Sequence, residues 1–160
     1  MKSRVYIETS VISYLTARKV KDIRLAGDQQ HTRVWWELHR AKFDLFSSDL
    51  VFNEARAGDP TVALARLDIL KLTTKLVTTP EAEFLAAKLL YEGAVPQKAA
   101  DDALHIAIAV THQVHYLLTW NCRHIANAVL RSKIDAVCIA AGYTPLVICM
   151  PPELMGIQSP

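Results

Sequence analysis

Short apolar runs rich in β-branched residues alternate with longer amphipathic stretches along the chain. The short runs are typical of buried strands and lie at residues 4–7, 43–46, 75–78, 114–119 and 145–150. Between them, apolar positions three and four residues apart predict helices at residues 11–17, 32–41, 49–57, 61–72, 80–91, 98–111 and 125–132. Residues 19–30 are polar, of mixed charge, and predict a connecting loop. Strands that alternate with helices favour a parallel sheet covered by helices on both faces.

Polar side chains stand where several of these elements meet. Glu8 directly follows the first predicted strand, and Asn121 lies just beyond the fourth. Asp102 lies in the first turn of an almost wholly apolar helix, on its inward stripe, and Glu54 lies on the apolar side of its own helix. Because ligands of open α/β sheets bind at the carboxyl ends of the strands, these side chains can converge at one edge.

Three carboxylates and an amide oxygen are hard ligands, which suit Mg²⁺ or Mn²⁺ better than zinc. Without a cation, three clustered carboxylates would repel one another, and at least one would be protonated. A divalent ion removes that conflict and can assist the hydrolysis of a phosphodiester. Solvated surface roles for Glu8 and Glu54 stay open as the alternative. Two neighbours are read as structural: Asp101 as a local partner at the helix start and His105 as a satisfied core histidine.

The bulk properties set limits on the class of protein. A chain of 160 residues fits a single domain spanning 1–160, and the apolar share of 51% with 21% charged residues indicates an extensive core, an oligomer interface or both. The net charge of +2 is compatible with nucleic acid but does not argue for it. Apolar runs too short for a membrane span, the lack of a signal-peptide core and three cysteines without metal-ligand spacing favour a cytoplasmic protein.

The adjacent Trp35 and Trp36 cannot both face one core if the helix has a single buried side. One of them is therefore expected at a partner surface, where tryptophan is enriched, or in stacking on a nucleic-acid base. Together with the high apolar content, this favours a homodimer.

Four segments in order resemble the signature motifs of PIN-domain nucleases, and most closely the VapC-like toxins of type II toxin–antitoxin pairs. They are residues 5–12 (VYIETSVI), Glu54 after SDLV at 48–51, residues 102–107 (DALHIA) and residues 118–124 (LTWNCRH). The resemblance implies a three-layer α/β/α sandwich whose central parallel sheet has strand order 3-2-1-4-5. It also implies a ribonuclease dependent on Mg²⁺ or Mn²⁺, with an RNA substrate, a homodimer and a cognate antitoxin.

Carried over residue by residue, the resemblance places Glu8, Glu54 and Asp102 at acidic catalytic and metal-binding positions. It places Asn121 at a fourth position that is Asp or Asn in the family. Thr9 and Ser10 match the small hydroxyl residues after the first acid, which steady that acid or a bound water and line the substrate site.

The sequence departs from the family pattern in several places. Glu8 is one methylene longer than the usual aspartate, and Asn121 brings no charge, which weakens a second metal site. His124 stands where relatives often have an acid, and it either contacts phosphate or caps a loop; Arg123 is a candidate phosphate contact or a surface residue. The leading hypothesis is a metal-dependent endoribonuclease. The alternatives are a PIN-like module that binds RNA or a partner protein without cleaving, and a ribonuclease that is not a toxin.

Overall fold

The computed structural model describes residues 1–156 and contains a five-stranded, all-parallel sheet in the order β3-β2-β1-β4-β5. This is the strand order expected from the sequence. The strands are short, and β1 lies at the centre. Their bounds are Ser3–Ile7 for β1, Phe43–Ser48 for β2, Thr74–Leu76 for β3, Tyr116–Leu118 for β4 and Val147–Cys149 for β5.

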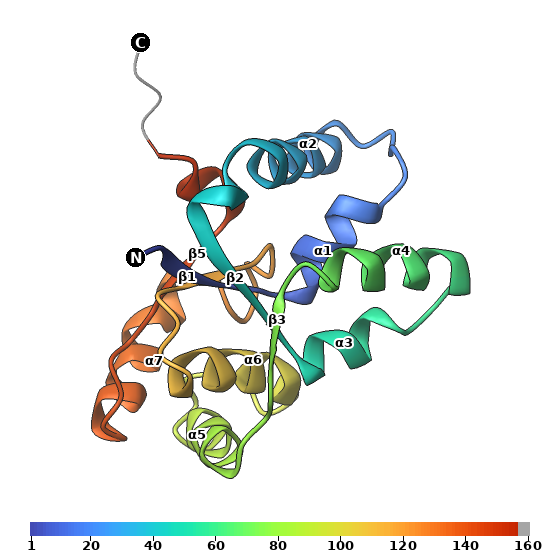
Figure 1. Ribbon diagram of the computed structural model, residues 1–160. Helices are drawn as coiled ribbons and strands as arrows, with labels where there is room; N and C mark the ends of the chain where they lie inside the picture. Colours follow the sequence, from blue (N-terminus) through green and yellow to red (C-terminus); the bar gives the residue numbers. More distant parts are fainter. Residues whose placement is uncertain (157–160) are drawn as a thin grey trace.

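Helices cover both faces of the sheet, which confirms the predicted three-layer α/β/α architecture (Figure 1). One layer packs α5, α6 and α7 together, and the other packs α1 against α2, α3 and α4. The α-helices are α1 Thr9–Thr16, α2 Ile23–Leu38, α3 Asp49–Ala55, α4 Pro60–Leu70, α5 Pro80–Tyr91, α6 Ala100–Thr111 and α7 Ala128–Ala140. Two 3₁₀-helices, η1 Arg40–Lys42 and η2 Pro151–Leu154, complete the described elements.

The central strand explains how the functional edge is built. Val5, Tyr6 and Ile7 are fully buried because helices cover both faces of β1. Ile7 pairs with Leu118 at the end of β4, and the next backbone N–H, that of Glu8, still donates to the Leu118 carbonyl at 3.0 Å. The chain therefore leaves β1 and β4 at the same level of the sheet.

Two helices differ most from the prediction, α2 and α7. The polar segment 19–30 is mostly not a loop, because α2 begins at Ile23 with Asp22 as its N-cap, accepting a hydrogen bond from the Leu25 amide at 2.9 Å. An N-cap can start a helix whose first turns carry no apolar stripe, and a search for apolar residues at helical spacing does not detect such a start. The seventh helix begins at Ala128, capped by Asn127, and extends to Ala140 instead of covering 125–132.

The expectation that one tryptophan would be exposed at a partner surface is wrong. Trp35 is fully buried and Trp36 is only 8% exposed, because α2 packs against α1 as well as against η1 and η2. The Trp35 ring lies against Phe43 of β2, and its indole N–H donates to the Leu154 carbonyl. The guanidinium of Arg40 covers the Trp36 ring, 4.7 Å from its centroid.

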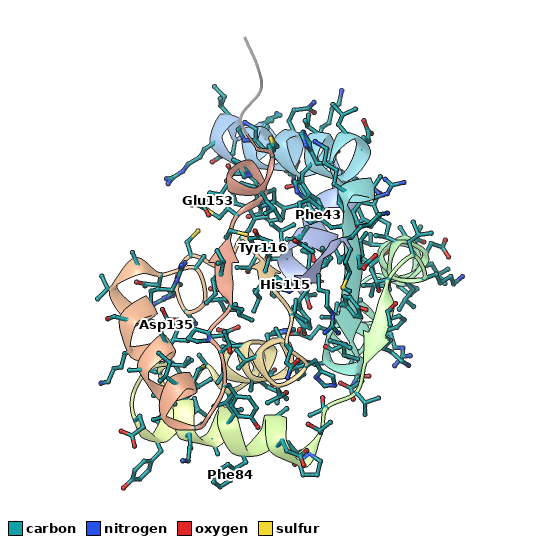
Figure 2. All side chains as sticks on the ribbon, turned by 60° about the vertical axis from the view of Figure 1, so that its left-hand side comes forward. Phe43, Phe84, His115, Tyr116, Asp135 and Glu153 are labelled. Carbon is teal, nitrogen blue, oxygen red and sulfur yellow. The ribbon has the colours of Figure 1, made fainter. Side chains whose placement is uncertain are left out.

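Other apolar side chains are exposed on both helical layers, among them Ile23 of α2 and Leu64 of α4. Phe84 of α5 projects away from the molecule with 64% of its surface exposed (Figure 2). Tyr91 and Ile139, on α5 and α7, are also exposed. Across residues 1–156, no helix combines the length and apolar character needed to cross a bilayer. All three cysteines are free thiols, as predicted.

Candidate functional site

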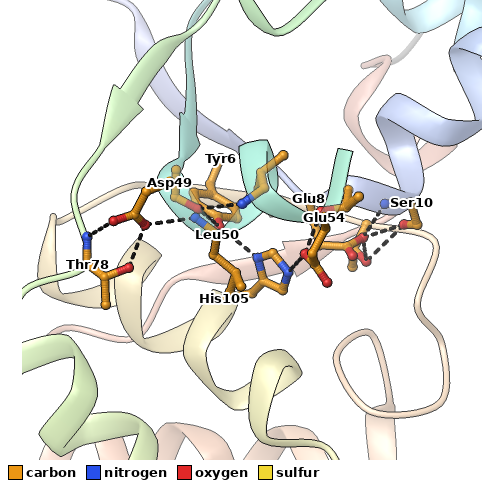
Figure 3. A network of polar contacts seen from close by, with 12 residues as sticks. Tyr6, Glu8, Ser10, Asp49, Leu50, Glu54, Thr78 and His105 are labelled. Carbon is orange, nitrogen blue, oxygen red and sulfur yellow. Dashed lines mark hydrogen bonds and ion pairs between the residues drawn. The ribbon is translucent and has the colours of Figure 1, made fainter. Parts of the chain in front are cut away.

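Glu8 directly follows β1, and its carboxylate caps the N-terminus of α1. Its Oε2 accepts hydrogen bonds from the backbone N–H of Ser10 at 3.0 Å, from the Ser10 hydroxyl and from the Thr119 hydroxyl at 2.8 Å (Figure 3). Glu8 is therefore the N-cap of α1. The extra methylene of glutamate is used to curl back over the first turn, which leaves the side chain 6% exposed.

Glu54 lies on α3 with its carboxylate between two donors from other elements. Its Oε1 accepts from the Thr9 hydroxyl at 2.7 Å and lies 2.5 Å from Nε2 of His105 (Figure 3). Burial is the largest influence on the pKa of Glu54 and raises it, but His105 and Thr9 together outweigh it, so that the pKa falls below its ordinary value. Thr9 thus steadies Glu54, the acid of a neighbouring helix, whereas the sequence had suggested that it steadies Glu8.

His105 is a core histidine, fully buried as expected, but its partners are functional candidates. Burial, the largest influence, lowers its pKa, whereas the hydrogen bond to Glu54 and the charges of Glu8, Glu54 and Asp102 raise it, and the net shift is upward. Glu8 follows β1, Glu54 lies on α3, and Asp102 lies one turn before His105 on α6. Glu8 and Glu54 lie near His105 at the carboxyl edge of the sheet (Figure 3).

Asp102, in the first turn of α6, is partly buried, and its Oδ2 lies 2.8 Å from Nδ1 of His124. The neighbouring Asp101 is exposed, so that Asp102 is the inward member of the pair, as predicted. His124 therefore holds a carboxylate of the candidate site through one ring nitrogen.

Asn121 organises the loop after β4. Its Oδ1 accepts from the backbone N–H of Arg123 at 3.2 Å and of His124 at 3.0 Å, which engages both lone pairs of this oxygen. The loop also depends on Thr119, whose hydroxyl accepts from the Asn121 N–H at 2.9 Å. Asn121 thus shapes the loop through the same side-chain oxygen that the sequence proposed as a metal ligand. Arg123 is exposed beside the site.

The three carboxylates share one feature. In each, one oxygen accepts all the hydrogen bonds that residues 1–156 supply, while Oε1 of Glu8, Oε2 of Glu54 and Oδ1 of Asp102 accept none. None of these three oxygens is among the buried unpartnered atoms of the described chain, so each reaches solvent. The site therefore presents three anchored carboxylates, each with an accessible oxygen.

This donor set fits a hard divalent cation in kind. In residues 1–156 no three carboxylate, imidazole or thiolate groups lie close enough together to enclose a metal ion. An open set of oxygens still suits Mg²⁺, which retains several waters and takes one or two carboxylates, better than it suits zinc. The residues present are thus compatible with the cation implied by the sequence motifs.

Three residues of the network were not singled out from the sequence, namely Tyr6, Ser48 and Thr119. Each is a hydroxyl residue in a strand or at its end, next to an element that carries an acid. Thr119 and Ser48 are fully buried, and a buried hydroxyl needs a partner. A hydroxyl at the last position of a predicted strand, close to a candidate acid, is the signal that could have found Thr119.

Known structures share this fold. VapBC2 from Rickettsia felis, solved bound to a DNA fragment from its promoter, aligns over 92% of this chain and 98% of that chain, with a TM-score of 0.58 and 15% sequence identity. VapC20 from Mycobacterium tuberculosis, described as a toxin that cleaves the sarcin-ricin loop, aligns over 74% of this chain and 91% of that chain, with a TM-score of 0.54 and 18% identity. No family model and no curated protein sequence matches the chain.

At these identities the likeness shows the fold. The chain has the PIN-like fold of VapC toxins, which the order of its sequence motifs had predicted.

Proposed function

We propose that this protein is a Mg²⁺- or Mn²⁺-dependent endoribonuclease in which Glu8, Glu54 and Asp102 hold the metal ion. The observation that carries the proposal is the set of three anchored carboxylates around His105, each with one oxygen accessible to solvent. The likeness in fold to a toxin described as cleaving the sarcin-ricin loop supports RNA as the substrate.

Neighbouring residues orient the proposed metal-binding glutamates. Hydroxyl and amide donors from Ser10 and Thr119 orient Glu8, and Thr9 and His105 orient Glu54. When bound, a divalent ion supplies an activated water and neutralises the charge that develops on the phosphodiester. Hydrolysis by water would leave a 3′-hydroxyl and a 5′-phosphate.

Two residues beside the carboxylates are proposed to bind the RNA backbone. The exposed guanidinium of Arg123 can pair with a phosphate. His124 approaches Asp102 through Nδ1, which leaves its Nε2 as the ring nitrogen that could donate to a phosphate oxygen.

The test is cleavage of a mixed RNA pool by the purified protein, with Mn²⁺ or Mg²⁺ and with EDTA. The Asp102→Asn variant should be inactive, because it removes a metal-binding charge. Asp101→Asn is the matched control, because Asp101 is an exposed acid in the same helical turn. Metal-dependent cleavage that only Asp102→Asn abolishes supports the proposal. Equal activity of wild type and Asp102→Asn would mean that the site is wrongly assigned.

We further propose that the protein is the toxin of a type II toxin–antitoxin pair, acting in the cytoplasm as a homodimer with a cognate antitoxin. The fold likeness to VapC20 and to VapBC2, the latter solved on promoter DNA, supports this role. Support for a dimer comes from exposed apolar side chains such as Phe84 and Ile139, since both tryptophans are buried. Light scattering of the purified protein measures the oligomer.

A second candidate is a PIN-like module that binds RNA or a protein without cleaving. It is favoured by Asn121, which brings no charge and whose side-chain oxygen is engaged in its own loop. Titration with Mn²⁺ separates the two functions. A nuclease should bind the ion at the carboxylates, whereas a module that only binds RNA or protein has no need of it.

A further inference from the structure

A chain of buried polar groups lies behind Glu54 (Figure 3). The hydroxyl of Tyr6 lies 2.8 Å from the Ser48 hydroxyl and 2.7 Å from Nδ1 of His105, and Nε2 of His105 lies 2.5 Å from Glu54 Oε1. Tyr6, Ser48 and His105 are all 0% exposed. Burying such a chain of polar groups costs free energy unless each group forms a hydrogen bond, and here each group has a hydrogen-bond partner.

The direction of the last hydrogen bond follows from the partners. If the imidazole is neutral, the Tyr6 hydroxyl donates to Nδ1 and the ring carries its proton on Nε2. If the imidazole is charged, both nitrogens carry protons, and Tyr6 accepts from Nδ1 while donating to Ser48. In both states Nε2–H donates to the Glu54 carboxylate, so the orientation of Glu54 does not depend on the charge of the ring.

The same chain of polar groups also sets the start of the helix that carries Glu54. The Ser48 hydroxyl caps α3 by accepting from the Val51 N–H at 3.2 Å, and Glu54 lies one turn further along this helix. Ser48 thus links the first turn of α3 to β1, and His105 links the second turn to α6. The position of Glu54 is therefore fixed in two ways: Ser48 fixes the start of its helix, and His105 binds its carboxylate.

We propose that His105 is a positioning residue for the metal site. Its ring is held by the hydrogen bond to Tyr6, which in turn contacts Ser48, and its Nε2 binds Oε1 of Glu54. Only Oε2 of Glu54 is then presented to a divalent cation. Thr9 binds the same Oε1 from α1, and the two donors together define the plane of the carboxylate. This inference rests on the proposed metal-dependent function and assigns the part that a fully buried residue plays in it.

The test compares Mn²⁺ affinity in purified variants, measured by electron paramagnetic resonance of the free ion. His105→Leu removes the donor to Glu54 and should weaken Mn²⁺ binding by about 10–100-fold, as is typical when an outer partner of a metal ligand is lost. His105→Gln places an amide N–H close to the position of Nε2 and should restore most of the affinity. Tyr6→Phe removes the hydrogen bond to Nδ1 of His105 while leaving Nε2 in place, and should also weaken Mn²⁺ binding.

The matched control is His112→Gln at the other end of α6, where the side chain bonds only the Ile108 carbonyl among residues 1–156. It should bind Mn²⁺ like the wild type. Circular dichroism and thermal unfolding establish that each variant is folded. If His105→Leu does not fold, Tyr6→Phe decides the question.

The hydrogen bond between His105 and Glu54 can also be observed directly in the metal-free protein. Long-range ¹H–¹⁵N correlation of His105 should show a protonated Nε2 in the wild type and a shifted Nε2 signal in Glu54→Gln. Unchanged Mn²⁺ affinity in folded His105→Leu and Tyr6→Phe would overturn the positioning role while leaving the nuclease proposal intact. Failure of the wild type to bind Mn²⁺ would overturn both.

Discussion

Thr119→Val tests whether the hydroxyl network at the strand ends holds the site together. Valine has nearly the shape of threonine, and Thr119 is fully buried, so the substitution removes a hydroxyl without opening a cavity. The two short hydrogen bonds of this hydroxyl are lost, the one donated to Glu8 Oε2 at 2.8 Å and the one accepted from the Asn121 N–H at 2.9 Å, together with a long contact of 3.5 Å to the Ser10 hydroxyl.

The magnitude follows from the kinds of group involved. A hydrogen bond to a charged acceptor contributes about 1.5–3 kcal/mol, and a donor left without a partner costs about 1–3 kcal/mol when it is buried. Glu8 keeps its two contacts with Ser10, and Asn121 is only partly buried, so the lower halves of these ranges apply. We expect a loss of about 2–4 kcal/mol. For a chain of this size that corresponds to a fall in Tm of about 4–15 °C.

Urea unfolding monitored by circular dichroism measures the loss, and Thr119→Ser is the control. Serine keeps the hydroxyl and loses one methyl group, which should cost only about 0.5–1.5 kcal/mol. If Thr119→Val proves as stable as Thr119→Ser or more so, the hydroxyl does not hold Glu8 and the loop together, and the reasoning fails.

Two further predictions concern acid stability and metal binding. Partial burial is the largest influence on the pKa of Asp49 and raises it, but hydrogen bonds from Thr78 and Leu50 outweigh it and lower the pKa below its ordinary 3.8. The stabilisation is therefore present above pH 3.8 and lost as the pH falls towards the lower folded-state value. Asp49→Asn should thus destabilise the protein more at pH 7 than in acid below pH 3.8, and an equal loss in both conditions would refute the prediction. Saturating Mn²⁺, at about 100 times its Kd, should stabilise the wild type by about 2.7 kcal/mol and raise its Tm by about 5–10 °C, reversibly with EDTA, whereas Asp102→Asn should respond far less.

The sheet and the acids were predictable because both leave signals in the order of residues. Buried strands of a parallel sheet give short apolar runs, and Glu8 directly follows such a strand, whereas Asp102 stands in the first turn of an apolar helix. The strand order came from the resemblance of four motifs, since apolar runs alone do not specify which strands are neighbours. The inward direction of Asp102 followed from helical geometry and holds in the structure.

The remaining features depend on contacts between distant segments. Trp36 is buried because α2 has neighbours on more than one side, and a one-faced helix pattern does not anticipate this. His105 was correctly expected in the core, yet its function depends on Glu54, which lies 51 positions away in the sequence. The start of α2 was missed because Asp22 defines it through a cap and no apolar stripe marks it.

Only one carboxylate oxygen of Glu8 accepts hydrogen bonds, and this determines how an amide would be oriented at position 8. The Ser10 backbone N–H can only donate, so a glutamine at position 8 would turn its carbonyl oxygen towards Ser10. Its NH₂ group would then face solvent at the place where the carboxylate offers its accessible oxygen. Glu8→Gln would thus exchange an acceptor for a donor at the cation's position, and would oppose metal binding more strongly than the loss of one charge.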